Sequence, residues 1–242
     1  MNNHLAVAID TSGRAGSVAL GSGDDMLGKI VFDGQMRHAA ELLPSIKKLI
    51  DDNGRQMTDI TDVYVTDGPG SFTGLRIGIT AAKMLALAGG VRITAISSLY
   101  CTAMGGIDYA AANQTEGIEC VAVVIDAKRG QFFFAYYELD GDEWLLQSAE
   151  GLKTADQINE ILMQGKKTLF TGEGLKYYQD KFQSPCRLFL PEEDWAIKPE
   201  DVYKAAHCKA LAGEYEDPKN FLPRYLRLSD AEENLQKRMK QQ

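Results

Sequence analysis

The chain of 242 residues is 45% hydrophobic and 25% charged, an ordinary globular composition with enough apolar material for one large domain or two small ones. Its formal net charge of −8 disfavours a protein that binds nucleic acid by itself, because phosphate contacts require a basic surface. The four cysteines are widely spaced and form no Cys-x-x-Cys pair, so they indicate neither a zinc site nor a disulfide framework.

Neither apolar segment of the first part of the chain indicates a membrane protein. The N-terminus lacks a basic region, and Asp10 interrupts its short apolar run, so it does not resemble a signal peptide. The apolar stretch over 77–91 contains Lys83 and is too short to span a bilayer. We therefore expect a soluble, cytoplasmic protein that does not contact a membrane.

The first part of the chain alternates short strands with helices. Apolar runs predict the strands, and apolar residues at helical spacing predict the helices. Pro44 favours a helix that begins properly near Leu43, because proline suits a first turn better than a helix interior. The predicted order is a strand over 5–9 ending at Asp10, strands over 17–20 and 26–32, a helix over 38–51, a strand over 63–66, a helix over 73–88, a strand over 91–96, and a helix capped by Ser97 or Ser98 that ends near Met104.

A glycine-rich stretch, DGPGSFTGLRIGI at 67–79, joins the strand over 63–66 to the helix over 73–88. Its glycines and proline predict a tight turn, and Ser71 or Thr73 can cap the helix. Small residues then recur every four positions: Gly74, Gly78 and Ala82. Glycine in a helix interior costs about 1 kcal/mol relative to alanine, so another backbone should press on this face. Two interpretations stay open: a phosphate cradle, although the Walker lysine is missing, or a capped helix with a closely packed small face.

The second part of the chain begins after a predicted boundary at Gly105-Gly106 and the small, polar stretch over 110–117. We divide the chain there into two subdomains, 1–105 and 106–242. The elements predicted beyond it are strands over 120–125 and 131–137, a helix over 154–163, a strand over 168–170, a helix opened by Gly172-Glu173-Gly174 and ending near Phe182, a helix over 199–211, and a charged tail from Asp230.

The two subdomains open with similar sequences, AVAIDTSGRAGSVAL at 6–20 and VAVVIDAKRGQFFFAYY at 121–137. Each is an apolar strand, then Ile-Asp, then a basic turn containing glycine, then a second strand. The similarity indicates an internal duplication, although two unrelated β-hairpins could also look alike.

The aspartates that end the two opening strands, Asp10 and Asp126, are the candidates for chemistry. In a duplicated α/β fold they can face each other across a cleft and hold hydrated Mg²⁺ beside nucleotide phosphates. Thr11 and Ser12 would line this cleft, and Gly172 and Gly174 could close over an adenosine. Alternatively, each aspartate caps its own turn. The three histidines form no pair at helical spacing, which leaves a helical metal site unsupported.

Three stretches in order closely resemble the TsaB family, also called YeaZ: AIDTSGRAGSVAL, then HAAELLP with DGPGSFTGLRIG, then IDAKRGQFFFAYY. A later PRYLR at 223–227 is similar to that family's C-terminal signature. The resemblance covers most of 5–137 and the remainder only thinly. It implies the duplicated actin-like ATPase fold, an ASKHA or ribonuclease H-like α/β fold of two similar subdomains.

The resemblance also implies a function. TsaB is regarded as a non-catalytic scaffold that binds TsaD, the enzyme that transfers a threonylcarbamoyl group to adenosine 37 of tRNAs reading ANN codons. The small ATPase TsaE joins the pair, and TsaB alone forms homodimers through the same helical surface. We therefore expect a TsaD-like partner, a TsaE-like partner, a homodimer in their absence, and only indirect contact with tRNA.

One departure from TsaD matters for catalysis. TsaD resembles a metalloprotein with a His-x-x-x-His pair on its first helix, whereas the matching place here reads His38 and then Leu42. We therefore expect no metal, no catalytic residues and no metalloprotease activity. We also expect no required cofactor, with weak nucleotide or Mg²⁺ binding left open.

The helices over 43–52 and 73–88 carry more apolar and small residues than one buried face requires, so one face is expected to meet the partner. The predicted interface consists of Leu42, Ile46, Leu49, Gly74, Leu75, Gly78, Ile79, Ala82 and Lys83. The competing hypothesis is an ATP-binding phosphotransferase of the actin-like class that uses Asp10 and Asp126. It is disfavoured because only one Gly-x-Gly, Gly172 to Gly174, is available for an adenosine pocket.

Overall fold

The computed structural model describes residues 4–32, 38–113, 115–141, 143–162 and 165–227. Its elements are β1 (Ala6–Asp10), β2 (Ser17–Ser22), β3 (Asp25–Val31), α1 (His38–Asp52), β4 (Asp62–Gly68), α2 (Phe72–Gly89), β5 (Arg92–Ser97), α3 (Ser98–Ala112), β6 (Cys120–Asp126), β7 (Gln131–Asp140), β8 (Glu143–Thr154), α4 (Ala155–Ile161), β9 (Thr168–Thr171), α5 (Leu175–Tyr178), β10 (Arg187–Phe189) and α6 (Pro199–Leu211), with short 3₁₀ turns at Met57–Asp59, Gln179–Phe182 and Glu192–Asp194. Within the described residues, no helix is long and apolar enough to cross a membrane.

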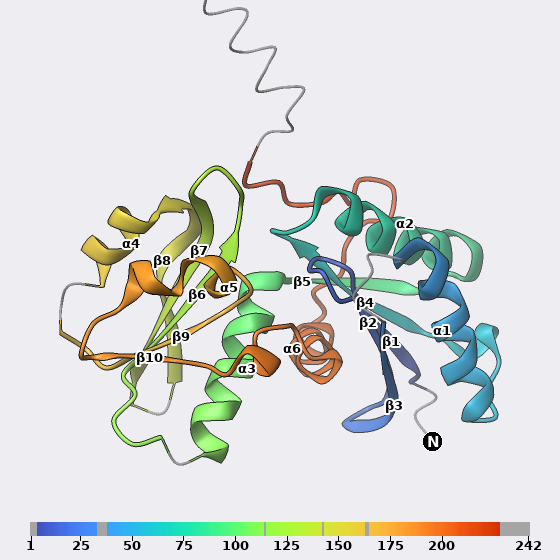
Figure 1. Ribbon diagram of the computed structural model, residues 1–242. Coiled ribbons are helices and arrows are strands. Elements are labelled where there is room, and N and C mark those ends of the chain that lie inside the picture. The colour runs from blue at the N-terminus through green and yellow to red at the C-terminus, as the bar shows by residue number, and fades with distance from the viewer. Residues whose placement is uncertain (1–3, 33–37, 114, 142, 163–164, 228–242) are drawn as a thin grey trace, which may run out of the picture.

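Two five-stranded sheets share one topology (Figure 1). The first has the order β3-β2-β1-β4-β5, and the second has the order β8-β7-β6-β9-β10 when listed in the same direction. In each sheet the opening strand is antiparallel to the next strand and parallel to the fourth. This repeat of strand order and direction confirms the predicted duplication, and it makes β1 equivalent to β6.

Alternation along β1 places side chains on both faces of the first sheet. Val7 and Ile9 face a core shared with α1 and α2, whereas Ala6 and Ala8 face a core shared with α6. Helix α6 packs against β1, β2, β4 and β5, although it comes from the C-terminal part of the chain. Helices therefore cover the first sheet on both faces, as an α/β fold with parallel strands requires.

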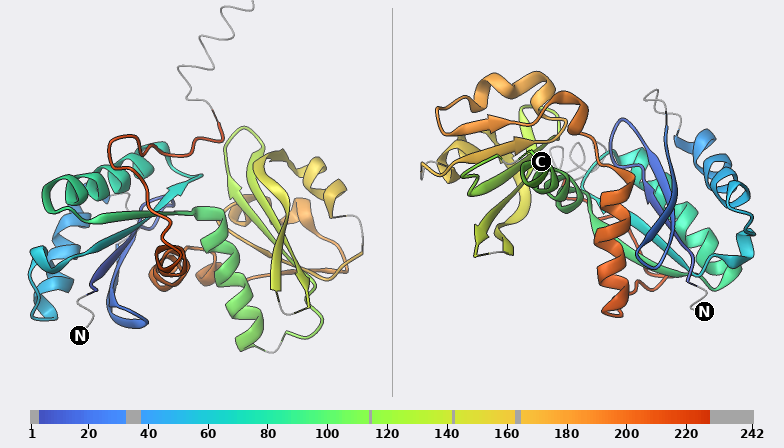
Figure 2. Two further views of the ribbon diagram at one scale, coloured as in Figure 1. Left: turned by 180° about the vertical axis from the view of Figure 1, so that it is seen from behind. Right: turned by 90° about the horizontal axis from the view of Figure 1, so that it is seen from below.

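Helix α3 packs on the second sheet, just as α6 packs on the first. It follows β5 of the first sheet but packs against β6, β7 and β9 of the second. Helices α3 and α6 also pack against each other, and both lie at the centre of the molecule (Figures 1 and 2). Each sheet is thus completed by a helix that follows the other sheet in the chain.

The predicted helix end near Met104 is wrong. Helix α3 continues through Gly105 and Gly106 to Ala112, so the predicted division after residue 105 falls inside it. These glycines serve close packing instead: a Cβ on Gly105 would lie 3.0 Å from Asp201 Oδ2, and one on Gly106 would lie 3.4 Å from Thr171 and Val121. The division into 1–105 and 106–242 stays a prediction, and the strands divide between β5 and β6.

Other boundaries also differ from the sequence predictions. Helix α1 includes Pro44 and begins at His38 rather than near Leu43. Pro44 is exposed, so water can satisfy the carbonyl oxygen of Ala40 that lacks its helical donor. Strands β8 and β10 were not predicted. Met163 at the end of one predicted helix, and the tail from Asp230, lie outside the described residues.

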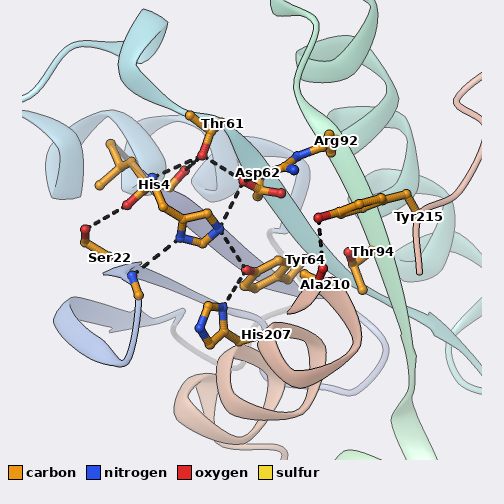
Figure 3. A network of polar contacts seen from close by, with 12 residues as sticks. His4, Ser22, Thr61, Asp62, Tyr64, Arg92, Thr94, His207, Ala210 and Tyr215 are labelled. Atoms are coloured by element: carbon orange, nitrogen blue, oxygen red, sulfur yellow. Dashed lines mark hydrogen bonds and ion pairs between the residues drawn. The ribbon is translucent and has the colours of Figure 1, made fainter. Parts of the chain in front are cut away.

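A polar network joins α6 to the first sheet (Figure 3). Tyr64 on β4 is fully buried, and its hydroxyl lies 3.0 Å from His207 Nδ1 on α6 and 3.3 Å from His4 Nε2. The His4 ring is in turn 3.1 Å from Asp62, which pairs with Arg92 at 2.8 Å. Each imidazole therefore forms a hydrogen bond with the buried Tyr64 hydroxyl at the contact between α6 and the first sheet.

A buried acid between α3 and α6 should make the stability depend on pH. Asp201 is 4% exposed, and its Oδ2 has no hydrogen-bond partner among the described residues. Burial, followed by the charges of Asp108 and Glu200, raises the pKa of Asp201 to about 7. The pKa of Asp201 is higher in the folded chain than in the unfolded chain. The contribution of Asp201 to the free energy of unfolding is therefore fully present below about pH 4, and it is lost as the pH rises through 7.

The wild type should therefore lose about 2–3 kcal/mol of unfolding free energy between pH 5 and pH 8 that Asp201→Asn keeps, because the amide does not ionise. Urea unfolding at both pH values measures this difference. Asp51→Asn is the control, since its side chain is exposed and its charge is not among those that raise the pKa of Asp201, and it should change the pH dependence far less. Parallel pH dependences for the wild type and Asp201→Asn would contradict the assignment.

Candidate functional site

A cleft of about 760 Å³ lies between the two halves. Its walls are the turn after β1, the N-terminus of α2, the turn after β6, Glu173 with Tyr177, and the segment 224–227. Ser12 and Asp126 from the predicted nucleotide cleft line it, whereas Asp10, Thr11, Gly172 and Gly174 do not. The structure thus brings only part of the predicted set to one cavity.

Asp10 serves its own turn. Its side chain is 3% exposed, and Oδ1 accepts hydrogen bonds from Ser12 N (3.0 Å), Ser12 Oγ (2.7 Å) and Thr66 Oγ1 (2.6 Å). Burial raises the pKa of Asp10, and these hydrogen bonds oppose the rise. Thr11 Oγ1 donates to the carbonyl oxygen of Gly74 at 2.8 Å, so it holds α2 rather than a ligand.

Asp126 also serves its own turn. Oδ1 accepts from Lys128 N, and Oδ2 pairs with Lys128 Nζ, both at 2.8 Å. Lys128 and Arg129 have positive φ values of 65° and 57°, a conformation that costs energy for residues with side chains. Of the two alternatives for the aspartates, these contacts favour turn capping. Among the described residues, no three His, Cys, Asp or Glu side chains are grouped to hold a metal ion.

The glycines predicted to close over an adenosine pack on β6. A Cβ on Gly172, which has φ of 107°, would lie 2.5 Å from the carbonyl oxygen of Val124. Gly174 donates its N–H to the same oxygen at 3.0 Å, and a Cβ there would approach it to 2.8 Å. Both glycines therefore permit the backbone to lie against β6.

The small face of α2 packs in the same way on the end of β1. A Cβ on Gly74 would overlap the carbonyl oxygen of Thr11, and one on Gly78 would lie 2.5 Å from Thr11 Oγ1. Ser71 is the N-cap residue and accepts from Gly74 N at 3.2 Å. The second interpretation of the glycine-rich stretch, a capped helix with a closely packed small face, agrees with these contacts.

The residues predicted to meet a partner lie mostly inside the chain's own core. Buried members are Leu42, Ile46, Leu49, Gly74, Leu75, Gly78, Ile79 and Ala82. Lys83 is half-buried, and its Nζ donates to the carbonyl oxygen of Phe221 at 3.0 Å. The exposed faces of the two helices carry other apolar side chains: Leu43 is 47% exposed, Met84 58% and Leu87 65%. The predicted helices are thus present, but the residues named for the interface lie on the helix faces that pack inside the chain.

Sequence reasoning missed the contacts that PRYLR makes. Tyr225 stacks on Phe72 with ring centroids 4.7 Å apart, and its hydroxyl accepts from Arg76 Nε at 3.0 Å. Arg224 reaches both Asp67 and Glu150. His38 was also unassigned; it is buried, and its Nε2 lies 3.2 Å from the carbonyl oxygen of Gly13. The late cluster of proline, tyrosine and arginine was the available signal.

Comparison with known proteins assigns the family. The family model described as "TsaD: tRNA N6-adenosine threonylcarbamoyltransferase" matches residues 33–234. The TsaB protein of Bacillus subtilis is 26% identical over 93% of this chain and 95% of its own length. The chain belongs to the TsaB family. The TsaB protein of Escherichia coli is 31% identical over 65% of this chain and 66% of its own length, and both relatives are named as tRNA threonylcarbamoyladenosine biosynthesis proteins.

Solved structures of this family have the same fold. YeaZ from Pseudomonas aeruginosa matches with a TM-score of 0.75 and 27% identity, over 92% of this chain and 100% of that chain. Together with the two equivalent sheets, this match confirms the duplicated actin-like α/β fold expected from the sequence. The TsaB resemblance seen in the sequence is likewise confirmed.

The contact between Gly74 and Thr11 generates a stability prediction. We expect Gly74→Ala to destabilise the chain by about 3 kcal/mol or more, because the new methyl group meets a backbone oxygen held by β1. Gly89→Ala in the last turn of α2 is the control and should change the stability by less than about 1 kcal/mol. Thermal unfolding of both variants tests this, and equal melting temperatures would contradict the close packing.

Proposed function

We propose that this chain is a non-catalytic scaffold subunit for threonylcarbamoylation of adenosine 37 in tRNAs reading ANN codons. In this role it binds and stabilises a TsaD-like subunit and recruits a TsaE-like ATPase. The names of its curated relatives support the pathway. The exposed apolar faces of α1 and α2 are the observation that carries the proposed scaffold role.

The partner surface is defined here as the exposed faces of α1 and α2 around Leu43, Met84 and Leu87. Thr80 and Ala88 are also exposed, so residues spaced by three or four positions present one face of α2. Large apolar side chains gathered on neighbouring helices are typical of a protein–protein interface. A helix pair of the partner, or of a second copy when the chain is alone, fits this surface and would form a four-helix layer.

The charge balance supports only indirect contact with tRNA. A net charge of −8 disfavours binding of the RNA phosphates by this chain, so the RNA would bind mainly to the partner. We also propose a cytoplasmic location away from membranes, because this role requires access to tRNA. No cofactor is required for the scaffold role.

The competing phosphotransferase would need free carboxylates to hold Mg²⁺. Asp10 accepts three hydrogen bonds from its own neighbourhood, and Asp126 is paired with Lys128. Gly172 and Gly174 are pressed against β6 rather than open to a ligand. These contacts argue for the scaffold.

We expect Met84→Glu and Leu87→Glu to reduce binding of a TsaD-like subunit at least tenfold, because each would bury a charge against the partner. Leu211→Glu is the control: this leucine is 74% exposed at the end of α6, away from the partner surface. Co-purification and calorimetric titration measure binding, with circular dichroism to verify folding. Wild-type affinity in both partner-surface variants would refute the assignment.

Reconstitution of the modification tests the non-catalytic role. The mixture contains tRNA, a TsaD-like enzyme, a TsaE-like ATPase and the carbamoyl-adenylate synthase, with and without this chain. We expect activity to require the chain but to tolerate Asp126→Ala and Asp10→Asn, since both aspartates cap turns. If either substitution stops the reaction while the complex assembles, the scaffold proposal fails and the nucleotide cleft is functional.

A further inference from the structure

The segment 221–227, FLPRYLR, is called the strap here. It runs along α2 and then reaches the second half of the molecule, as the last red part of the ribbon in Figure 1 shows. Its first contacts are with the first half: Lys83 Nζ donates to the carbonyl oxygen of Phe221, and Arg224 N donates to the carbonyl oxygen of Asp67 at 2.8 Å. Tyr225 then stacks on Phe72 of α2. The strap is therefore fastened to α2 and to the end of β4.

Its last residues contact the second half. Leu226 packs against the core of the second sheet, and Arg227 Nη1 donates to the carbonyl oxygen of Ala127 in the turn after β6. Residues 224–227 also line the cleft. One short segment thus crosses the cavity and is bonded on both sides of it.

The guanidinium of Arg224 bonds to both halves. Its Nη2 donates to the carbonyl oxygen of Gly68 at 2.8 Å and lies 3.3 Å from Asp67 Oδ1, both at the end of β4. Its Nη1 pairs with Glu150 Oε2 on β8 of the other sheet. The two carboxylate side chains are only 20% and 10% exposed, so removal of the guanidinium leaves two mostly buried negative charges without it.

The backbone at the end of β4 is shaped for this crossing. Gly68 has φ of 124°, and a Cβ there would lie 2.8 Å from the carbonyl oxygen of Arg224. A side chain at this position would therefore displace the strap. The halves also meet where α3 packs on α6, and neither helix lines the cleft. Two further contacts join them: Arg14 Nη2 donates to the Tyr177 hydroxyl at 3.1 Å, and Ser97 Oγ donates to Glu150 Oε1.

We propose that the strap is a clamp that holds the cleft at one width, and that Arg224 is the strap residue whose side chain bonds to both halves. Release of Arg224 permits the second sheet to swing away from the first about the packed helices α3 and α6. The clamp depends on contacts within one chain, so it does not rest on the proposed scaffold function.

Hydrogen exchange of the full-length chain tests the clamp. In Arg224→Gln we expect peptides covering the turns 11–16 and 126–130 to exchange at least tenfold faster, while β1 and β6 stay protected. The radius of gyration from small-angle X-ray scattering should rise. Leu222→Ala is the matched control, because this strap side chain is 72% exposed, and it should behave as wild type.

Glu150→Gln is the second variant, since it removes the negative charge with which Arg224 pairs on the second sheet and keeps Arg224 paired with Asp67. It should accelerate exchange at the same turns. In the double variant, the exchange rate should be less than twofold higher than in Arg224→Gln alone. Wild-type exchange at both turns in the two single variants would overturn the clamp. Equal acceleration in β1 and β6 would also overturn it, since that pattern means general unfolding rather than opening of the cleft.

Discussion

The close approach of α2 to the end of β1 is the constraint on which the rest of the structure depends. Gly74 and Gly78 bring the helix onto Thr11, and the Thr11 hydroxyl bonds back to the Gly74 carbonyl oxygen. This contact fixes the turn after β1 and hence the position of Asp10. It also sets which side of α2 faces the sheet, so the opposite side must face outward.

Close packing of glycines against the opening strand also occurs in the second half, with different residues. Gly172 and Gly174 lie against β6 as the glycines of α2 lie against β1. In both halves, the loop between a parallel strand and its helix is pressed on the opening strand. The backbone of these segments therefore lies against the strand ends next to the aspartates, although Asp126 still lines the cleft. In this chain the duplicated fold keeps a cleft between its halves, while the carboxylates of Asp10 and Asp126 bond to their own turns.

The order of elements along the chain, the duplication and many element boundaries could be predicted from the sequence because they depend on local patterns. Apolar runs ending at Asp10 and Asp126, and the Ser71 cap, are of this kind. The faces of α1 and α2 could not be predicted, since Ile46 and Met84 are both apolar and only the position of the sheet distinguishes them. Strand β8 was missed because it is an edge strand with many exposed positions, which weakens its alternation. The links of Arg224 join residues far apart in sequence, and no local pattern reports them.

The exchange of α3 and α6 between the halves has a consequence for synthesis on the ribosome. The first sheet is translated early, but the helix that covers Ala6, Ala8 and Tyr64 ends at Leu211. Until that helix emerges, one face of a finished sheet stays open to water and to other chains. The nascent chain therefore cannot bury this face until Leu211 has been made, and the exposed apolar surface favours aggregation during that interval.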